Sequence, residues 1–212
     1  MEHLPIFFQI KNKPCLVVGG GSIAARKVSL LLKAQAEVTV VSPELCHELK
    51  LLREEGNIHH VAREFEDMDL ENCVAVIAAT DAPPVNERVS QLAQQLRVPV
   101  NVIDKPELGS FIMPSIIDRS PVMIAVSTGG SSPVLARLIR TRLEGSIPAA
   151  YGHLAQLVES FRDKVKAAFP NVKSRRNFWE RILEGTVAAV SYTQLTLPTT
   201  GHGCRWRGGG GG

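Results

Sequence analysis

Residues 19–24 read Gly-Gly-Gly-Ser-Ile-Ala and fit the pattern G-x-G-x-x-A, between an apolar run and a helical repeat. Gly19 would permit a tight turn, Gly21 would let the backbone approach a pyrophosphate, and Ala24 would allow close helix–strand packing. Free N–H groups at the start of the helix would face the anion. The pattern predicts a dinucleotide site. The alternative is a glycine turn that only connects a strand to a helix.

The residues that would hold the ribose are less regular. An acidic residue about 20 positions after the glycines usually binds the ribose hydroxyls. No acidic residue stands at Val41 or Ser42, and Glu44 comes two places later, after a proline. Either Ser42 and backbone groups serve the ribose, or Glu44 turns back toward it. Because no arginine lies on this loop, the sequence favours NAD over NADP.

Two further stretches end predicted strands with groups that could do chemistry. The small residues 78–80, which end in Thr80, suit a cofactor crevice, whereas Asp81 could equally cap the next helix. Asp104 closes another apolar run, and a carboxylate there could accept protons during a dehydrogenation. The alternative for Asp104 is a capped turn before Pro106.

A third stretch predicts an anion site at the start of a helix. It combines flexible glycines and hydroxyls in Thr128, Gly129, Gly130, Ser131 and Ser132. The helix that follows carries Arg137, Arg140 and Arg142, and apolar walls could come from Phe111, Ile112 and Met113. Such a pocket would suit a large, flat polycarboxylate. The alternative is a solvated basic face on an ordinary helix.

Alternating strands and helices must position these groups. Apolar runs predict strands at 5–10, 15–18, 37–41, 58–62, 73–79 and 98–103, the first two joined by a tight turn. Helical spacing predicts helices at 22–33, 44–55 and 84–96. This order predicts a parallel sheet covered on both faces, a Rossmann-like α/β domain.

The pattern changes after Asp104. Two apolar segments at 110–117 and 121–127 predict antiparallel strands, and helices are expected at 133–144, 149–169 and 174–183. The predicted architecture is α/β: a Rossmann-like parallel sheet domain, then a β-containing dimerisation segment and a small helical domain. The expected boundaries are 1–109, 110–147 and 148–190, followed by a non-native tail at 191–212. That tail reads as translated adapter sequence, and we expect the natural chain to continue differently.

Composition excludes several classes of protein. The chain has 212 residues, 44% hydrophobic and 21% charged, which is typical of a soluble globular protein. A net charge of +3 is too small to indicate nucleic acid or a membrane surface as partner. The four cysteines are widely spaced, which predicts reduced thiols in a cytoplasmic protein and no metal site. His59 and His60 are expected to be ordinary strand histidines.

Three stretches resemble one known family. They are "HLPIFFQIKNKPCLVVGGGSIAARK" at 3–27, "AATD" through "NVID" at 78–104, and above all "SFIMPSIIDRSPVMIAVSTGGSSPVLARLIR" at 110–140. From residue 1 to about residue 189 the chain resembles the N-terminal region of siroheme synthase, the precorrin-2 dehydrogenase and sirohydrochlorin ferrochelatase module. The last stretch is far more specific than the glycine turn.

The resemblance implies a function and a set of residues. NAD would accept a hydride from precorrin-2 to give sirohydrochlorin, into which ferrous iron is then inserted. Asp104 would be the catalytic residue of both steps. The cofactor would contact Ser22, Ile23, Pro43 and Glu44, and the tetrapyrrole carboxylates would meet residues 128–132 and nearby arginines such as Arg137. Family members often carry a phosphorylatable serine at the position of Thr128.

The resemblance also implies a homodimer, built through the segment after Asp104 and the helical end. Many relatives continue into a methyltransferase domain, which is missing here. Two other hypotheses stay open: a dehydrogenase without chelatase activity, and a non-catalytic module that binds NAD or a tetrapyrrole. An aspartate beside the predicted pocket counts against the non-catalytic module.

Overall fold

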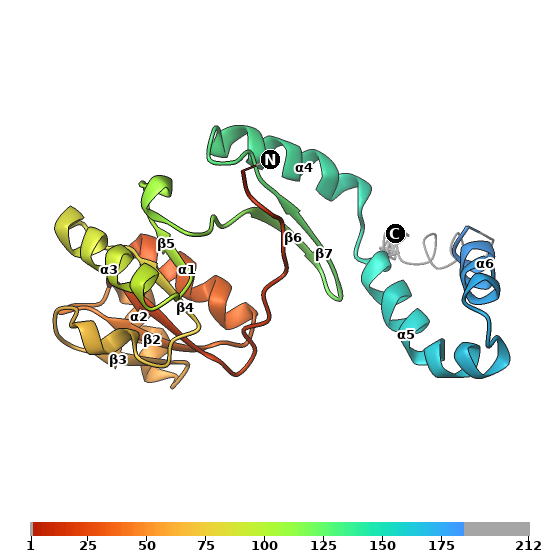
Figure 1. Cartoon of the computed structure of the whole chain (residues 1–212), viewed down its shortest axis with the longest axis horizontal. Helices are drawn as coiled ribbons and strands as arrows, with labels where there is room; N and C mark the ends of the chain where they lie inside the picture. The colour runs from red at the N-terminus through yellow and green to blue at the C-terminus, as the bar shows by residue number, and fades with distance from the viewer. Residues whose placement is uncertain (1, 185–212) are drawn as a thin grey trace, which may run out of the picture. The chain divides into compact units, whose positions relative to one another are not determined.

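The structure, a computed structural model, describes residues 2–184 (Figure 1). The proposed tail at 191–212 therefore lies outside the described residues. The chain forms two compact units. The first contains the chain up to Pro114 together with Ser127–Leu135, and the second contains Ser115–Val126 and the chain from Ala136 onward.

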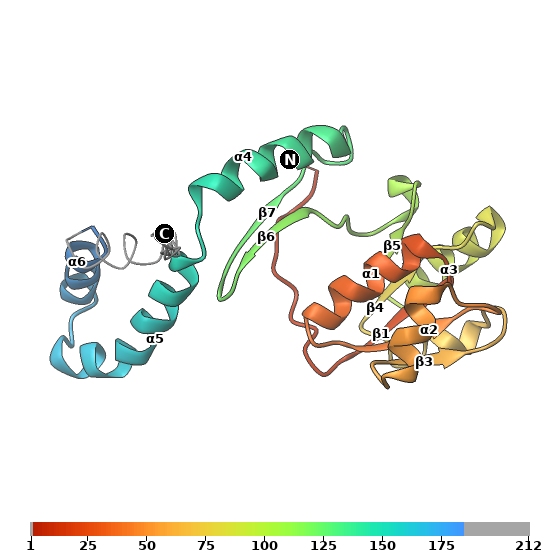
Figure 2. The same cartoon turned by 180° about the vertical axis from the view of Figure 1, so that it is seen from behind.

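A five-stranded parallel sheet forms the centre of the first unit (Figures 1 and 2). Its strand order is β3-β2-β1-β4-β5, and every neighbouring pair is parallel. The strands are β1 (Pro14–Val18), β2 (Glu37–Val41), β3 (Ile58–Val61), β4 (Ala75–Ala78) and β5 (Val100–Val102). The predicted Rossmann-like parallel sheet is confirmed.

Helices cover both faces of this sheet, as the alternation of strands and helices predicts. The elements are α1 (Ser22–Lys33), α2 (His47–Glu54) and α3 (Pro83–Gln95), with short 3₁₀ helices η1 (Asp67–Leu70) and η2 (Pro106–Leu108). Val28 of α1 and Leu49 of α2 are buried in the core on one face. Val89 of α3 and Leu70 of η1 are buried in the core on the other.

The strand order creates a crevice at the carboxyl edge of the sheet. From β1 the chain crosses to β2 on one side, and it later returns to β4 on the other side of β1. The connections that leave β1 and β4 therefore diverge, and ligands of open parallel sheets bind at such a switch point. The glycine turn follows β1 and residues 79–80 follow β4, so both predicted cofactor segments lie here.

Two sequence-based expectations for the first unit are wrong. Residues 5–10 form no strand, because β1 already pairs with β2 on one side and β4 on the other, which leaves no edge for a hairpin partner. The second helix begins at His47 instead of residue 44. Its predicted first residues form a loop against the glycine turn, where the N–H of Cys46 donates to the carbonyl of Gly20 at 2.7 Å.

The second unit contains an antiparallel hairpin and helices. Strands β6 (Ser115–Arg119) and β7 (Val122–Val126) pair as predicted, although the first begins five residues later than expected. Helix α4 (Pro133–Ser146) begins in the first unit and continues into this one, and α5 (Ala150–Ala168) and α6 (Val172–Leu183) follow. Gly152 of α5 lies so close to the hairpin turn that a Cβ would stand 2.9 Å from the carbonyl oxygen of Ser120.

Within residues 2–184, none of the helices combines the length and the apolar character that crossing a membrane requires.

Candidate functional site

Gly19 and Gly20 are required by the packing of the chain itself. Gly19 has φ +124°, which side-chain-bearing L residues rarely adopt, and a Cβ there would overlap the carbonyl oxygen of Ala79 after β4. A Cβ on Gly20 would overlap the carbonyl oxygen of Glu44. The turn is therefore held tightly between the segments that follow β2 and β4.

Gly21 is different, because a Cβ there would meet no atom within 4 Å. It is the N-cap of α1, with φ −83°, and the first intrahelical bond runs from the N–H of Ala25 to its carbonyl at 3.0 Å. The N–H groups before Ala25 stand at the open start of the helix. They include those of Ser22 and Ile23, which are exposed, and the first turn of α1 carries no acidic residue. This open, electropositive helix start fits a pyrophosphate.

The segment after β4 is fixed by one buried side chain. The amide of Asn86 on α3 accepts from the hydroxyl of Thr80 at 2.8 Å and donates to the Thr80 carbonyl at 2.9 Å. Thr80 also donates its backbone N–H to this amide at 3.2 Å. Asn86 is 7% exposed, so it acts from inside the domain. The sequence analysis missed Asn86, which holds Thr80 at the wall of the crevice.

The loop after β2 carries both candidate groups for the ribose, Ser42 and Glu44. Ser42 is buried, and its hydroxyl donates to the carbonyl of Glu44 at 2.7 Å. That donor is therefore engaged inside the loop. Pro43 and Glu44 are exposed beside the glycine turn. The Glu44 carboxylate is thus accessible to a ligand, and its contact with the ribose stays a prediction.

Asp104 follows β5 at the same edge of the sheet. The N–H of Ile103 donates to the carbonyl of Ala78 at 3.0 Å, so β5 stays paired to its end. Asp104 then adopts φ +62°, a left-handed conformation that aspartate tolerates better than most residues, and its side chain is exposed. The predicted base therefore stands in solvent immediately after the strand.

Lys27 of α1 is an electrostatic neighbour of Asp104 that the sequence analysis missed. Burial lowers the pKa of the half-buried Lys27 ammonium, and the charge of Arg26 lowers it further, whereas the charge of Asp104 raises it. The only signal in the sequence was a basic pair that follows the glycine motif. Lys27 therefore places a basic side chain near the predicted base.

Asn101, three residues before Asp104, is buried in β5. Its Nδ2 donates to the carbonyl of Phe111 at 3.0 Å, which fixes one predicted wall residue beside β5. Its Oδ1 is buried and has no hydrogen-bond partner within the described part of the chain. No feature of the sequence singled out this asparagine.

The turn at 128–132 is closed by its own hydroxyls. The hydroxyl of Thr128 accepts from the N–H of Ser132 at 3.1 Å and donates to its carbonyl at 3.0 Å. The hydroxyl of Ser132 caps α4 by accepting from the N–H of Leu135 at 3.2 Å. Gly129 and Gly130 supply positive φ angles of +64° and +90°. The N–H of Gly129 also donates to the hydroxyl of Ser127 at 3.1 Å, and that of Ser131 to the carbonyl of Thr128 at 3.1 Å. Four N–H groups of this helix start are thus already engaged, which leaves fewer of them for an anion.

The structure brings this turn, but not the predicted arginine, into the same unit as Asp104. A Cβ on Gly130 would lie 3.9 Å from the side chain of Pro106, two residues after Asp104. Arg137 is exposed and belongs to the second unit. Arg140 is paired with Glu144 at 2.7 Å. The predicted role of the arginines at the substrate stays a prediction.

The titratable groups outside the crevice carry no metal-site signature. Within residues 2–184, no three His, Cys, Asp or Glu side chains gather as metal ligands do. Cys15, Cys46 and Cys73 are free thiols. Burial, with a smaller contribution from Cys73, raises the pKa of Cys15 to about 11, so this thiol stays protonated in the core.

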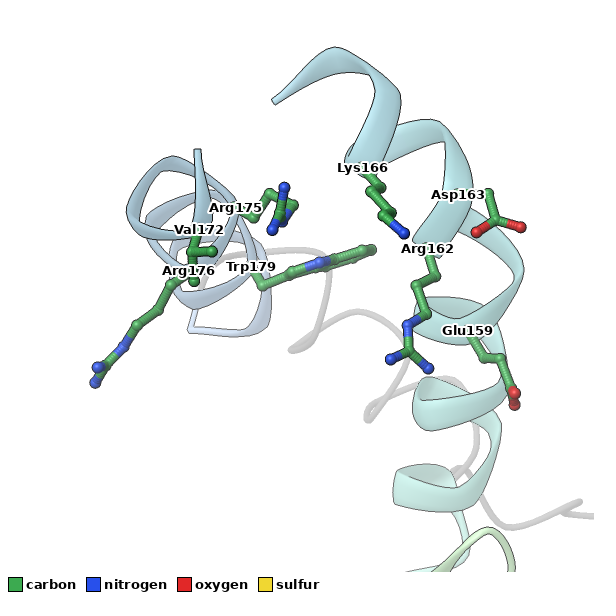
Figure 3. Close-up of a pocket in the computed structure, with 8 residues that line it drawn as sticks. All are labelled: Glu159, Arg162, Asp163, Lys166, Val172, Arg175, Arg176 and Trp179. Carbon is green, nitrogen blue, oxygen red and sulfur yellow. The ribbon is translucent and has the colours of Figure 1, made fainter. Parts of the chain in front are cut away.

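A separate cavity of about 710 Å³ lies between α5 and α6 (Figure 3). The indole of Trp179 extends from α6 toward Arg162 and Lys166 of α5. Part of the surrounding positive charge is already engaged, because Arg175 donates to the carbonyl of Phe169 at 2.9 Å and Arg176 pairs with Glu180 at 2.7 Å. None of the predicted site residues lines this cavity.

Three sequence families match consecutive parts of the chain. Residues 6–115 match a family described as putative NAD(P)-binding. Residues 119–146 match the central region of sirohaem biosynthesis proteins, and residues 150–193 match the sirohaem synthase dimerisation region.

Whole relatives and a solved structure give the same picture. The chain is 59% identical over 190 residues to a siroheme synthase of Thioalkalivibrio sulfidiphilus (strain HL-EbGR7), covering 90% of this chain and 39% of the relative. It is 56% identical over 187 residues to a siroheme synthase of Methylobacillus flagellatus (strain ATCC 51484 / DSM 6875 / VKM B-1610 / KT), covering 88% and 40%. It thus spans about two-fifths of these curated relatives. The structure of SirC, a precorrin-2 dehydrogenase, has the same fold, with a TM-score of 0.72 at 23% identity over 91% of this chain and 98% of that one.

Proposed function

The chain belongs to the siroheme synthase family, matching its N-terminal region, and on that premise we propose that it oxidises precorrin-2 to sirohydrochlorin with NAD. One observation carries the proposal. The exposed carboxylate of Asp104 and the open helix start at Gly21 lie at the same carboxyl edge of one parallel sheet. A cofactor cradle and a base at one edge are what a dehydrogenation needs.

Different residues of the chain would hold the cofactor and accept the proton. The helix start at Ser22 and Ile23 holds the pyrophosphate, Glu44 meets the ribose, and Thr80 lines the crevice. When bound, NAD supplies a hydride acceptor. The oxidation removes one hydride and one proton from the macrocycle, and Asp104 takes the proton at its carboxylate oxygen.

We extend the proposal to a second step, the insertion of ferrous iron into sirohydrochlorin. Iron is a substrate here, and its entry releases two pyrrole protons from the macrocycle. The same carboxylate of Asp104 would accept them one at a time, and because it is exposed it would pass the first proton to solvent before it takes the second. The turn at Thr128–Ser132 would meet substrate carboxylates through those backbone N–H groups that its hydroxyls leave free.

The test measures both steps on one set of variants. We expect the wild-type chain to form NADH from NAD and precorrin-2, and to insert iron or cobalt into sirohydrochlorin. Asp104→Asn, which tolerates the left-handed backbone, should slow NADH formation by about 10²–10⁴-fold. Glu107→Gln, an exposed acidic neighbour, is the control and should stay near wild type.

The outcomes separate the hypotheses. Full activity of Asp104→Asn in both assays would show that the catalytic assignment is wrong. NADH formation without metal insertion in the wild type would leave a dehydrogenase alone. NADH binding without turnover of precorrin-2 would point to the non-catalytic module.

We also propose that the protein acts as a homodimer. The match of residues 150–193 to a dimerisation region supports this, as do the exposed apolar side chains of α5. Leu157 and Phe161 are each 45% exposed and lie one helical turn apart.

A further inference from the structure

His60 on β3 makes a contact that the proposed chemistry does not use. Its Nε2 lies 2.9 Å from the carbonyl oxygen of Ser42, at the end of the neighbouring strand β2. A carbonyl oxygen only accepts hydrogen bonds, so the proton of the neutral ring must be on Nε2. His60 is half-buried, whereas the neighbouring His59 is exposed. Of the two histidines on this strand, His60 therefore contacts the end of β2, whereas His59 faces solvent.

The residue that His60 holds organises the loop after β2. The N–H of Ser42 donates to the carbonyl of Val61 at 3.2 Å, and its hydroxyl donates to the carbonyl of Glu44 at 2.7 Å. With the bond from His60, all three polar groups of Ser42 are engaged. The direction in which the chain leaves β2 is thereby fixed.

This loop in turn packs against the glycine turn. The carbonyl of Glu44 occupies the space where Gly20 lacks a side chain, and the N–H of Cys46 donates to the Gly20 carbonyl at 2.7 Å. The loop backbone is thus clamped between β3 and the cofactor turn, while the Glu44 carboxylate stays exposed. A displacement at Ser42 would move Glu44 relative to the helix start that binds the pyrophosphate.

We propose that His60 is a positioning residue that sets the cofactor preference by holding Ser42 and hence Glu44 at the adenosine ribose. The inference rests on the proposed function for its cofactor. A carboxylate at this position accepts hydrogen bonds from ribose hydroxyls and repels a 2′-phosphate. Correct placement therefore both strengthens binding of NADH and disfavours NADPH.

The test titrates NADH and NADPH, by their own fluorescence, into four forms of the chain. His60→Phe keeps a ring but cannot donate, His60→Gln restores a donor, and His59→Ala is the control on the same strand. We expect His60→Phe to weaken NADH about 5- to 10-fold, the loss of one hydrogen bond, and to move the NADH-to-NADPH affinity ratio toward NADPH. His60→Gln should recover most of both, and His59→Ala should match wild type.

A purely structural role would lower the melting temperature without changing that ratio, and this result, or unchanged NADH affinity of His60→Phe, would overturn the inference. If His60→Phe does not fold, Ser42→Ala tests the same loop by removing the bond to Glu44, and an unchanged ratio there would also overturn it. Failure of the proposed function is distinguishable, because the wild type would then bind NADH normally and leave precorrin-2 unoxidised.

Discussion

Three consecutive glycines have three different physical reasons to be glycine. Gly19 has a positive φ, and a Cβ there would overlap the carbonyl oxygen of Ala79. A Cβ on Gly20 would overlap the carbonyl oxygen of Glu44. Gly21 has an ordinary φ, and among the described residues no atom lies close enough to exclude a side chain there. A bound dinucleotide would account for glycine at this position, and the difference between folding and binding can be measured.

Gly21→Ser should separate folding from binding. Serine is a good N-cap, so the free energy of unfolding should stay equal or rise by a few tenths of a kcal/mol. The added side chain would stand where the pyrophosphate approaches, so NADH should bind about tenfold more weakly or worse, a loss of ~1.4 kcal/mol. Urea unfolding and NADH fluorescence titration measure the two quantities.

The control for this change is Gly20→Ala, which should show the opposite pattern. Its Cβ would overlap backbone, so the protein should lose about 1–3 kcal/mol of stability before any ligand is added. Wild-type NADH affinity of Gly21→Ser would mean that the dinucleotide does not lie against this turn.

Elements in this fold are positioned by a few long-range polar contacts as well as by the apolar core. Asn86 of α3 ties down the end of β4, and His60 of β3 ties down the end of β2. In the connection between β3 and β4, the guanidinium of Arg63 donates two hydrogen bonds of 2.7 and 2.8 Å to Asp69 of η1. Each of these contacts fixes a connection that apolar packing alone would leave free.

The pair Arg63–Asp69 gives a prediction for η1. Hydrogen bonding from Arg63, helped by the backbone N–H of Glu66, lowers the pKa of Asp69 below its ordinary value of 3.8. Stability from this carboxylate is therefore present above pH 3.8 and is lost as pH falls through the lowered folded pKa. Asp69→Asn should cost about 1–3 kcal/mol at pH 7, and the difference from wild type should shrink below pH 3.8.

Chemical unfolding at pH 7 and pH 3 measures this difference. Arg88→Gln serves as the control, because its pair with Asp67 is equally short at 2.7 Å but both side chains are more than half exposed. That change should cost at most about 0.5 kcal/mol. An equal loss in both variants would mean that burial of Asp69 contributes nothing.

At the scale of the whole molecule, the chain combines a unit that matches a putative NAD(P)-binding family with a unit that matches the sirohaem synthase dimerisation region. The first unit holds the glycine turn, Asp104 and the turn at 128–132. The second unit exposes apolar side chains on α5, within the stretch that matches the dimerisation family. A large apolar surface on a helix typically marks a protein–protein contact.

Charge placed on the exposed apolar side chains of α5 should separate the proposed dimer. We expect Leu157→Arg and Phe161→Arg together to convert dimers into monomers at micromolar concentration, as measured by light scattering after gel filtration, because a charge in an apolar interface is costly to desolvate. Leu51→Arg is a matched control, since Leu51 is also 45% exposed but lies on α2. Dimers that persist in the double variant would place the contact elsewhere.

The sequence alone determined the elements whose signals are local. Helical periodicity after the glycine motif predicted the helix at 22–33. A β-rich composition predicted the strand at 37–41. Both have the bounds that the structure shows. The place of Asp104 was also predictable, because a residue that follows a buried parallel strand must stand at the carboxyl edge of the sheet.

Only the tertiary structure decided the contacts between distant parts of the chain. Residues 5–10 have the composition of a strand but no free edge beside β1, and a sequence does not display which edges are taken. Lys27 beside Asp104, the buried Asn101 and the bond from His60 to Ser42 depend on segments that meet through the sheet order. Helical spacing placed Arg137 on one face of its helix, but only the structure showed that this residue belongs to the second unit.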